Sequence, residues 1–205
     1  KLIGLGTKKK PIFFKKQKTR AWGTIALQGA DTKKSQLSNI VFDGGSGDVS
    51  GHIKYTGALS IQDTKDIIIK NISMKNNSNF DDMLHIVYVD NIKLDNINIE
   101  NSNMDAIDID MSNNVEIVNT KISQSGNDGI DLMESDVIIS NVKILNSGDK
   151  AISVGENSFM ILNNSSISKN NIGIATKDKS ISFIINSNLI NNNVSLNNYK
   201  KNWQY

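Results

Sequence analysis

The sequence contains no cysteine, only one proline and only two histidines in its 205 residues. The lack of cysteine excludes disulfide scaffolds, thiolate nucleophiles and cysteine-ligated zinc sites. Two histidines also cannot complete a three-histidine metal site. No run of about eighteen apolar residues is present, so no transmembrane helix is expected.

The chain also carries almost no excess of positive over negative charge. Lysine and arginine (23) nearly balance aspartate and glutamate (21), which leaves a formal net charge of +2. That excess of cations is too small for a protein built mainly to bind nucleic acid. The chain opens at Lys1 without an initiator methionine or a signal peptide, as expected of a processed or excised segment.

The sequence is instead rich in isoleucine (31) and asparagine (29), and both recur at a fixed period. The segment Asp105–Ile109 has counterparts at Asp82–Ile86, Asp128–Leu132 and Lys150–Val154, at intervals of 22 or 23 residues. A second series has nearly the same spacing: Asn71, Asn96, Asn119, Asn141, Asn164 and Asn186. Two series with one period predict a solenoid.

Within each repeat, apolar and polar residues alternate, as at Ile107 and Ile109, which is the period of a β-strand. The fixed leucines and helix-forming half of leucine-rich repeats are absent. The sequence therefore predicts an all-β fold, a right-handed parallel β-helix of roughly nine coils. Isoleucines are expected to stack in a dry core, and corner asparagines to hydrogen-bond from coil to coil.

We expect a single domain over residues 1–205. Residues 1–70 should form irregular coils, because a glycine-rich loop at 43–57 interrupts the repeat, and residues 71–198 should form regular coils. The aromatic and basic segment 199–205 is expected to cap the last coil. No cap precedes the first strand, so we expect upstream coils, neighbouring domains or subunits at that N-terminal edge.

Two polar columns should line one surface of the coil. If Ile107 and Ile109 point inward, Asp108 points outward. Stacking then aligns Ser60, His85, Asp108, Asp131, Ser153 and Ala175 in one column, and Asp82, Asp105, Asp128 and Lys150 in a second column at the preceding corner. Carboxylates about 4.8 Å apart repel, so such columns should raise pKa values, recruit Lys150 or bind a cation.

These columns supply the candidate site residues. Ca²⁺ accepts irregular coordination by oxygen, which makes Asp105, Asp108, Asp128 and Asp131 its candidate ligands. Lys150, with a pKa lowered by partial desolvation, is the candidate catalytic base, and His85 would orient a sugar or act as an acid. Candidate substrate-binding residues are Asp82, Ser153 and Trp22, although we favour packing in the core or a cap as the use of Trp22.

The runs Asn127–Leu132 and Ser147–Glu156 resemble β-helix segments of secreted or cell-surface bacterial proteins, which often accompany spore-coat-kinase-like or lamin-tail-like domains. The resemblance covers most of the chain and implies an extracellular or cell-surface location, but no reaction. A more distant similarity is to pectate-lyase-like and polygalacturonase-like β-helices. The polygalacturonase Gly-Asp-Asp element here reads Gly148-Asp149-Lys150, and that family's later histidine is missing, which argues against hydrolysis by its mechanism.

Three functions are compatible with these features. We favour a rigid, non-catalytic module that binds or presents a polysaccharide or cell-surface glycan, because polar ladders are common on solenoids. The first alternative is a Ca²⁺-dependent lyase acting on a uronate-containing glycan, which we rank above a hydrolase. The second is a self-assembling filament or sheath subunit. No cofactor other than Ca²⁺, no nucleic-acid partner and no membrane span is expected.

Overall fold

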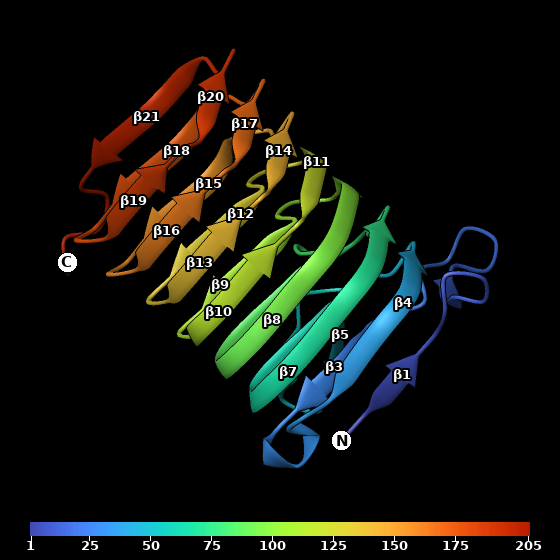
Figure 1. The fold of residues 1–205 in the computed structure, drawn as a ribbon. Helices are drawn as coiled ribbons and strands as arrows, with labels where there is room; N and C mark the ends of the chain where they lie inside the picture. The colour runs from blue at the N-terminus through green and yellow to red at the C-terminus, as the bar shows by residue number, and fades with distance from the viewer.

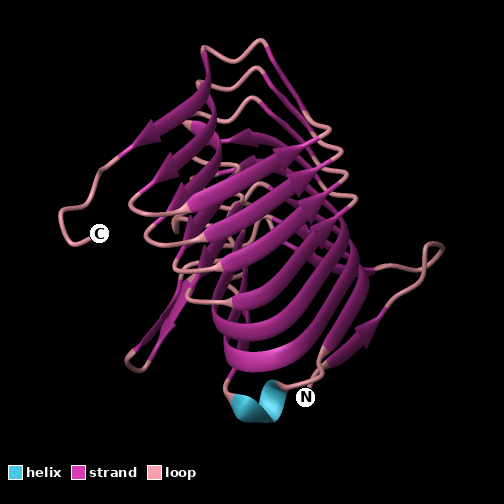
Figure 2. Cartoon of the chain, turned by 60° about the vertical axis from the view of Figure 1, so that its left-hand side comes forward, coloured by secondary structure: helices cyan, strands magenta, loops and turns pink.

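The computed structural model describes residues 1–205 and is a parallel β-helix, as predicted (Figure 1). Each regular coil contributes one strand segment to each of three faces, and the faces wrap around a common core (Figure 2). The only helical element is a 3-10 turn, Ala30–Thr32. It is neither long nor apolar enough to cross a membrane.

The first face carries the candidate site. Its stacked segments are β3 (Ile25–Gln28), the start of β7 (Leu59–Lys75), the start of β8 (Leu84–Ser102), β9 (Ile107–Asp110), β12 (Ile130–Met133), β15 (Lys150–Gly155), β18 (Ile172–Lys177) and β21 (Val194–Tyr199). All of these pairings are parallel.

The other two faces share the long strands β7 and β8 with the first. The second face stacks β1 (Ile3–Leu5), β4 (Gln36–Asp43), β10 (Asn113–Val118), β13 (Asp136–Ser140), β16 (Phe159–Asn163) and β19 (Ile181–Ile185) with them. The third stacks β2 (Ile12–Lys15), the end of β4, β11 (Lys121–Ser125), β14 (Lys143–Leu145), β17 (Ser166–Ser168) and β20 (Asn188–Ile190).

The regular coils number about six, from β7 to β20, so the expected count of roughly nine was wrong. The error lies in the N-terminal third, where residues leave the repeat. A loop separates β2 from β3, and the antiparallel hairpin of β5 (Asp48–Ser50) and β6 (Ile53–Tyr55) projects from the coil within the predicted glycine-rich loop. These residues add length without adding coils.

Isoleucine stacking builds the core. Ile107, Ile130, Ile152 and Ile174 are register partners on successive coils, and each is at most 1% exposed. They belong to one continuous cluster of 38 buried apolar residues. Burying one such side chain contributes about 1.5–3 kcal/mol, so the stacked column is a main source of stability and fixes the register of the outward residues as well.

The recurrent asparagines turn the corners between the second and third faces. The predicted series from Asn71 to Asn186 has positive φ throughout, for example 58° at Asn96 and 53° at Asn119. Asparagine tolerates this left-handed conformation better than other residues with a Cβ atom. The amide of Asn96 also donates to Asn71 Oδ1 at 2.8 Å. The expected coil-to-coil hydrogen bonds are therefore present, with backbone geometry as a second reason for the asparagines.

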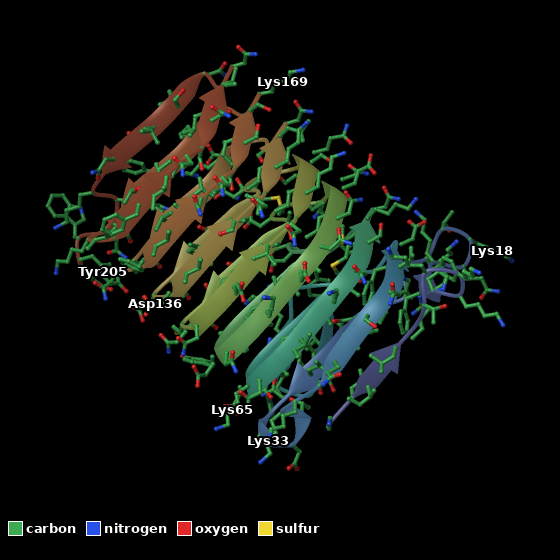
Figure 3. All side chains as sticks on the ribbon, in the orientation of Figure 1. Lys18, Lys33, Lys65, Asp136, Lys169 and Tyr205 are labelled. Atoms are coloured by element: carbon green, nitrogen blue, oxygen red, sulfur yellow. The ribbon has the colours of Figure 1, made fainter.

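The C-terminal segment 199–205 does not cover the last coil. Trp203 is 93% exposed, and Leu196 and Phe183 of the last strands are also exposed. The tail instead runs back along the side of the coil, so that Tyr205 lies beside the strands (Figure 3) and donates to Glu134. The backbone N–H groups of Lys201 and Asn202 both donate to Asp178 Oδ1 at 2.7 Å, which directs the chain sideways.

The corner geometry predicts the effect of substitution at Asn96. Asn96→Ala should lower the free energy of unfolding by about 1–3 kcal/mol, because alanine is strained at positive φ and the amide hydrogen bond is lost. Asn96→Gly should recover part of this loss, since glycine adopts positive φ freely. Urea unfolding measures both, with Asn98→Ala, two residues away and outside the positive-φ series, as control. Equal losses for Asn96→Ala and Asn98→Ala would contradict the argument.

Candidate functional site

The outward side chains of the first face stack as the sequence indicated. Ser60 pairs with His85, His85 with Asp108, Asp108 with Asp131, Asp131 with Ser153, and Ser153 with Ala175. We call this surface the acidic face and define it by Asp82, His85, Asp105, Asp108, Asp110, Asp128 and Asp131.

His85 is the centre of the tightest group on the acidic face. Its Nε2 atom lies 3.4 Å from Asp110 Oδ2 and 3.8 Å from Asp108 Oδ2. The three side chains keep their ligand atoms within 4.8 Å of one another, and the imidazole is only 11% exposed. Strand alternation accounts for the group, because Asp108 and Asp110 are two residues apart on β9 and both point outward.

A second contact orients the imidazole from behind. Thr56 Oγ1 lies 2.9 Å from His85 Nδ1, and the same hydroxyl is hydrogen-bonded to Asp82, which is almost fully buried. The chain Asp82–Thr56–His85 thus fixes the orientation of the ring.

Burial and mutual repulsion raise the pKa values of several carboxyl groups on the acidic face. Burial, followed by the negative charge of Asp110, raises the pKa of Asp108 to about 9. Burial raises the pKa of Asp128 to about 7 against the opposing charge of Lys150, and that of Asp82 to about 6 against the hydrogen bond from Thr56. Asp108 therefore keeps its proton at neutral pH, as the predicted crowding of carboxylates requires.

The corner column has a different environment. Asp105 Oδ1 accepts from the backbone N–H of Asp128 at 2.7 Å and from the Asn127 amide at 2.8 Å. One coil on, Asp128 Oδ1 accepts from the backbone N–H of Lys150 at 2.8 Å. These two carboxyl groups hold the corners of successive coils together, which is a structural use for both.

Lys150 differs from the base that the sequence suggested. Its ammonium is hydrogen-bonded to Asp149 and lies 3.5 Å from Asp128 Oδ1. Burial acts to lower the pKa of Lys150, but the hydrogen bond to Asp149 and the charge of Asp128 outweigh it, so the pKa is raised. A lysine with a raised pKa is protonated at neutral pH and cannot accept a proton, so the expected lowering of its pKa was wrong.

The four expected Ca²⁺ ligands do not form one donor set. Asp105 and Asp128 each use an oxygen for the backbone of the next coil, whereas Asp108 lies with His85 and Asp110. That group offers one imidazole nitrogen and two carboxyl oxygens, and Ca²⁺ prefers oxygen ligands alone. The donor chemistry therefore fits Ca²⁺ poorly, and we derive no step through it.

Two polar atoms on the same face have no partner within the protein. They are Asp131 Oδ1 and Ser153 Oγ, both buried at the atom level, and they belong to register partners on β12 and β15. Leaving such a group unpaired costs about 1–3 kcal/mol. Ser153, a candidate substrate-binding residue, is fully buried.

Trp22 packs among aromatic side chains at the N-terminal end of the coil. Its ring packs against Phe14 and Phe42, with centroids 5.7 and 5.8 Å apart, and its Nε1–H donates to the Asp43 carbonyl at 3.1 Å. It also borders a cleft of about 440 Å³ together with Phe80. Packing at the N-terminal end, the use that the sequence favoured, accounts for these contacts.

Sequence reasoning missed two members of the site. Asp110 was visible as an outward residue of the Asp-Ile-Asp run but was not assigned to a column, because it lies one alternation beyond Asp108. Thr56 carried no signal. The loop after β6 brings it to His85.

Comparison with known proteins agrees with this architecture. The family model described as "Right handed beta helix region" matches residues 82–201, in agreement with the predicted right-handed fold. No curated protein sequence matches the chain at a significant level.

Similar solved structures include the periplasmic alginate epimerase AlgG, with 15% identity and a TM-score of 0.59 over 84% of this chain and 48% of that one. Pectate lyase Pel9A has 11% identity and a TM-score of 0.66 over 86% and 52% of the two chains. The catalytic domain of a GH87 α-1,3-glucanase in complex with nigerose has 11% identity and a TM-score of 0.55 over 91% and 47%. The chain thus spans about half the length of these structures, and at such identities the likeness shows the fold alone.

The raised pKa of Asp108 predicts how stability depends on pH. Between its ordinary value of 3.8 and about 9, the folded protein binds this proton and the unfolded chain does not. Stability must therefore fall as pH rises through that window. Between pH 7 and 9 Asp108 is the main contributor, with a slope of at most about 1.4 kcal/mol per pH unit, since the pKa values of Asp82 and Asp128 lie at or below about 7.

Urea unfolding at several pH values measures this slope. Asp108→Asn should flatten the profile between pH 7 and 9 and stabilise the protein at pH 9, because it removes a carboxyl group that ionises at a cost. Asp90→Asn, an exposed carboxylate that accepts from Asn114 away from the acidic face, is the control and should keep the wild-type slope. A wild-type profile that is flat over this range would contradict the raised pKa.

Proposed function

The chain belongs to the right-handed β-helix family, and from that membership we propose that its acidic face binds a polysaccharide and cleaves a glycosidic bond by acid–base chemistry. The three solved structures described above are, by their names, an epimerase of alginate, a lyase of pectate and an α-1,3-glucanase. Their shared architecture supports a polysaccharide as the ligand of this chain. We place the activity outside the cytoplasm, where such polymers occur.

One observation carries the proposal. Asp108 holds a proton at neutral pH while its carboxyl oxygen lies 3.8 Å from the imidazole Nε2 of His85. A carboxyl group whose pKa is raised by burial and by a named neighbouring charge is a candidate catalytic acid. A ladder that served only to space the coils would gain nothing from desolvating the two carboxyl groups of Asp108 and Asp110 around one imidazole, because each costs free energy to bury. This cost is our reason for favouring a catalytic role over the non-catalytic module.

We assign a role to each member of the group. Asp108, protonated, donates its proton to the oxygen of the bond that breaks. Asp110, whose ligand oxygen lies within 4.8 Å of that of Asp108, is close enough to act as the nucleophile: it bonds to the anomeric carbon as the leaving oxygen takes the Asp108 proton, and water then displaces Asp110 while returning a proton to Asp108. His85, held through Nδ1 by Thr56, balances the charge between the two carboxyl groups as the proton moves. General acid–base catalysis of this kind contributes about 10²- to 10⁴-fold to a rate.

The Ca²⁺-dependent lyase is the weaker alternative. Elimination needs a base that can accept the proton α to a uronate, and Lys150 is committed to Asp149 and Asp128. It also needs a cation to neutralise the uronate, and the acidic face fits Ca²⁺ poorly. Hydrolysis therefore agrees better with these residues, although the sequence favoured elimination.

An activity screen tests the proposal. The protein is incubated with neutral and acidic polysaccharides, and new reducing ends and unsaturated product are recorded in the same samples. We expect reducing ends without unsaturated product, and no effect of EDTA. Asp108→Asn and His85→Gln should each lower kcat by about 10²-fold or more, whereas the control Asp90→Asn should leave kcat unchanged.

Other outcomes separate the alternatives. Unsaturated product that depends on Ca²⁺ and disappears in Lys150→Ala would establish the lyase in place of the hydrolase. Turnover that survives both Asp108→Asn and His85→Gln would place the chemistry elsewhere. Binding of a polysaccharide without any turnover across the panel would return the chain to the non-catalytic module.

A further inference from the structure

A cleft opens among the loops at the N-terminal end of the coil. It has a volume of about 440 Å³ and is lined by residues from three loops, 20–23, 46–48 and 79–80. A second cavity of about 380 Å³ adjoins it, because both cavities are lined by residues 20–22. We call the two cavities together the N-terminal cleft. Each volume is in the range of small-ligand sites, about 300–1,000 Å³, and no residue of the acidic face lines either cavity.

Two aromatic rings border this cleft, and glycines leave the space that the rings occupy. A methyl group at Gly45 would lie 2.7 Å from Trp22 Cζ2, and a methyl group at Gly47 would lie 2.6 Å from Phe80 Cγ. Carbon atoms in contact lie about 3.5–4.0 Å apart, so a larger residue at either position would displace a ring. The predicted glycine-rich loop therefore places both rings at the N-terminal cleft.

Positive charge gathers at this end of the molecule. Residues 1–20 contain eight of the 23 lysines and arginines, and no acidic residue precedes Asp31. Lys18 lies on the loop between β2 and β3 (Figure 3). Two of these cations, Lys15 and Arg20, line the N-terminal cleft, and Arg20 is the only arginine in the chain.

The cations at the N-terminal cleft are not neutralised within the chain. Lys15 and Arg20 form no ion pair, and neither does Lys54, whose ammonium lies 5.8 Å from the centre of the Phe80 ring. Asp48 is the only carboxylate that lines the cleft. Three cations thus stand against one carboxylate, and the guanidinium of Arg20 is free to pair with a ligand.

We propose that the N-terminal cleft is a second carbohydrate site, which binds an anionic sugar of a polysaccharide. A guanidinium binds a carboxylate or a sulfate through two parallel hydrogen bonds, which is the role of Arg20. The rings of Trp22 and Phe80 offer apolar area to the C–H groups of the sugar, and the Asn79 amide can donate to and accept from its hydroxyl groups. The inference goes beyond the proposed hydrolysis, because it uses no residue of the acidic face.

A nucleic acid is the other polymer that combines anionic groups with flat rings. Binding along a nucleic acid requires many cations, since each phosphate that is neutralised adds to the affinity. The formal net charge of this chain is only +2, and its cations are confined to one end while carboxyl groups line the acidic face. A single anionic sugar, held by one guanidinium, needs no such excess. We therefore favour the polysaccharide.

The fluorescence of Trp22 tests the site directly. The chain has two tryptophans, and Trp203 is 93% exposed, so Trp203→Phe leaves Trp22 as the only reporter without disturbing the core. This protein is titrated with a galacturonate hexasaccharide, a sulfated glucose hexasaccharide, the same glucose hexasaccharide without sulfate, and inorganic sulfate. We expect a saturable change in emission with a charged hexasaccharide, and the better of the two identifies the anionic group. The uncharged hexasaccharide and the free ion should bind at least about tenfold more weakly.

Substitutions of Arg20 in the same background test its role. Arg20→Gln should weaken binding by about tenfold or more, because a charge-assisted contact is lost. Arg20→Lys should recover only part of the affinity, since lysine keeps the charge but lacks the planar fork. Lys121→Gln, which removes one charge from an exposed position on β11, is the matched control and should leave the affinity unchanged. Arg20 is exposed, so urea unfolding should show equal stability for Arg20→Gln and its parent.

Each remaining outcome has one meaning. Equal binding of the charged and uncharged hexasaccharides, or no binding of either charged one, would overturn the site. Inorganic sulfate that binds as tightly as the charged hexasaccharides would indicate an adventitious ion only. Tighter binding of a single-stranded oligothymidine would make the ligand a nucleic acid. Binding that is lost in Asp108→Asn but retained in Arg20→Gln would move the ligand to the acidic face. Binding as expected, in a protein that turns over no polysaccharide, would support the site and refute the hydrolysis.

Discussion

Parallel stacking at a fixed register is the constraint on which the rest of this structure depends. Successive coils lie about 4.8 Å apart, and the isoleucine column locks Ile107, Ile130 and Ile152 into line. Every outward residue is then held beside its equivalent on the next coil, whether or not the two side chains attract. Asp108 and Asp131 cannot separate as two charged groups on a flexible surface would, so their repulsion has to be relieved by a proton or by a partner.

The coil relieves this repulsion in two ways, according to where the carboxyl group stands. At the corner the backbone leaves the sheet, so free N–H groups are available, and Asp105 and Asp128 accept from them. Within the strand the N–H groups are already used by the neighbouring coils, so Asp108 and Asp131 have no such donor. The raised pKa of Asp108 and the unpartnered oxygen of Asp131 follow from this difference. The residues available for chemistry are therefore those in the strand.

The features that recur with the repeat could be predicted from the sequence, and the contacts outside the repeat could not. The fold, the asparagine corners and the stacking of His85, Asp108 and Asp131 all follow from a period that can be read directly. Thr56 follows a hairpin that belongs to no repeat, and the state of Lys150 depends on Asp149, which lies outside both columns. The coil number failed for the same reason, because a mean period assigns irregular residues to coils that they do not form. Non-periodic contacts need coordinates, since no pattern in the sequence marks them.

The charge of the acidic face restricts its ligands more than the fold does. Related architectures occur in proteins named for alginate, pectate and α-1,3-glucan, so the coil itself does not select between acidic and neutral polymers. A polyanion needs a cation that is free to pair with it. Lys150 is bound to two carboxylates of its own chain, so a polyanion would have to displace Asp149 or Asp128 to reach this ammonium.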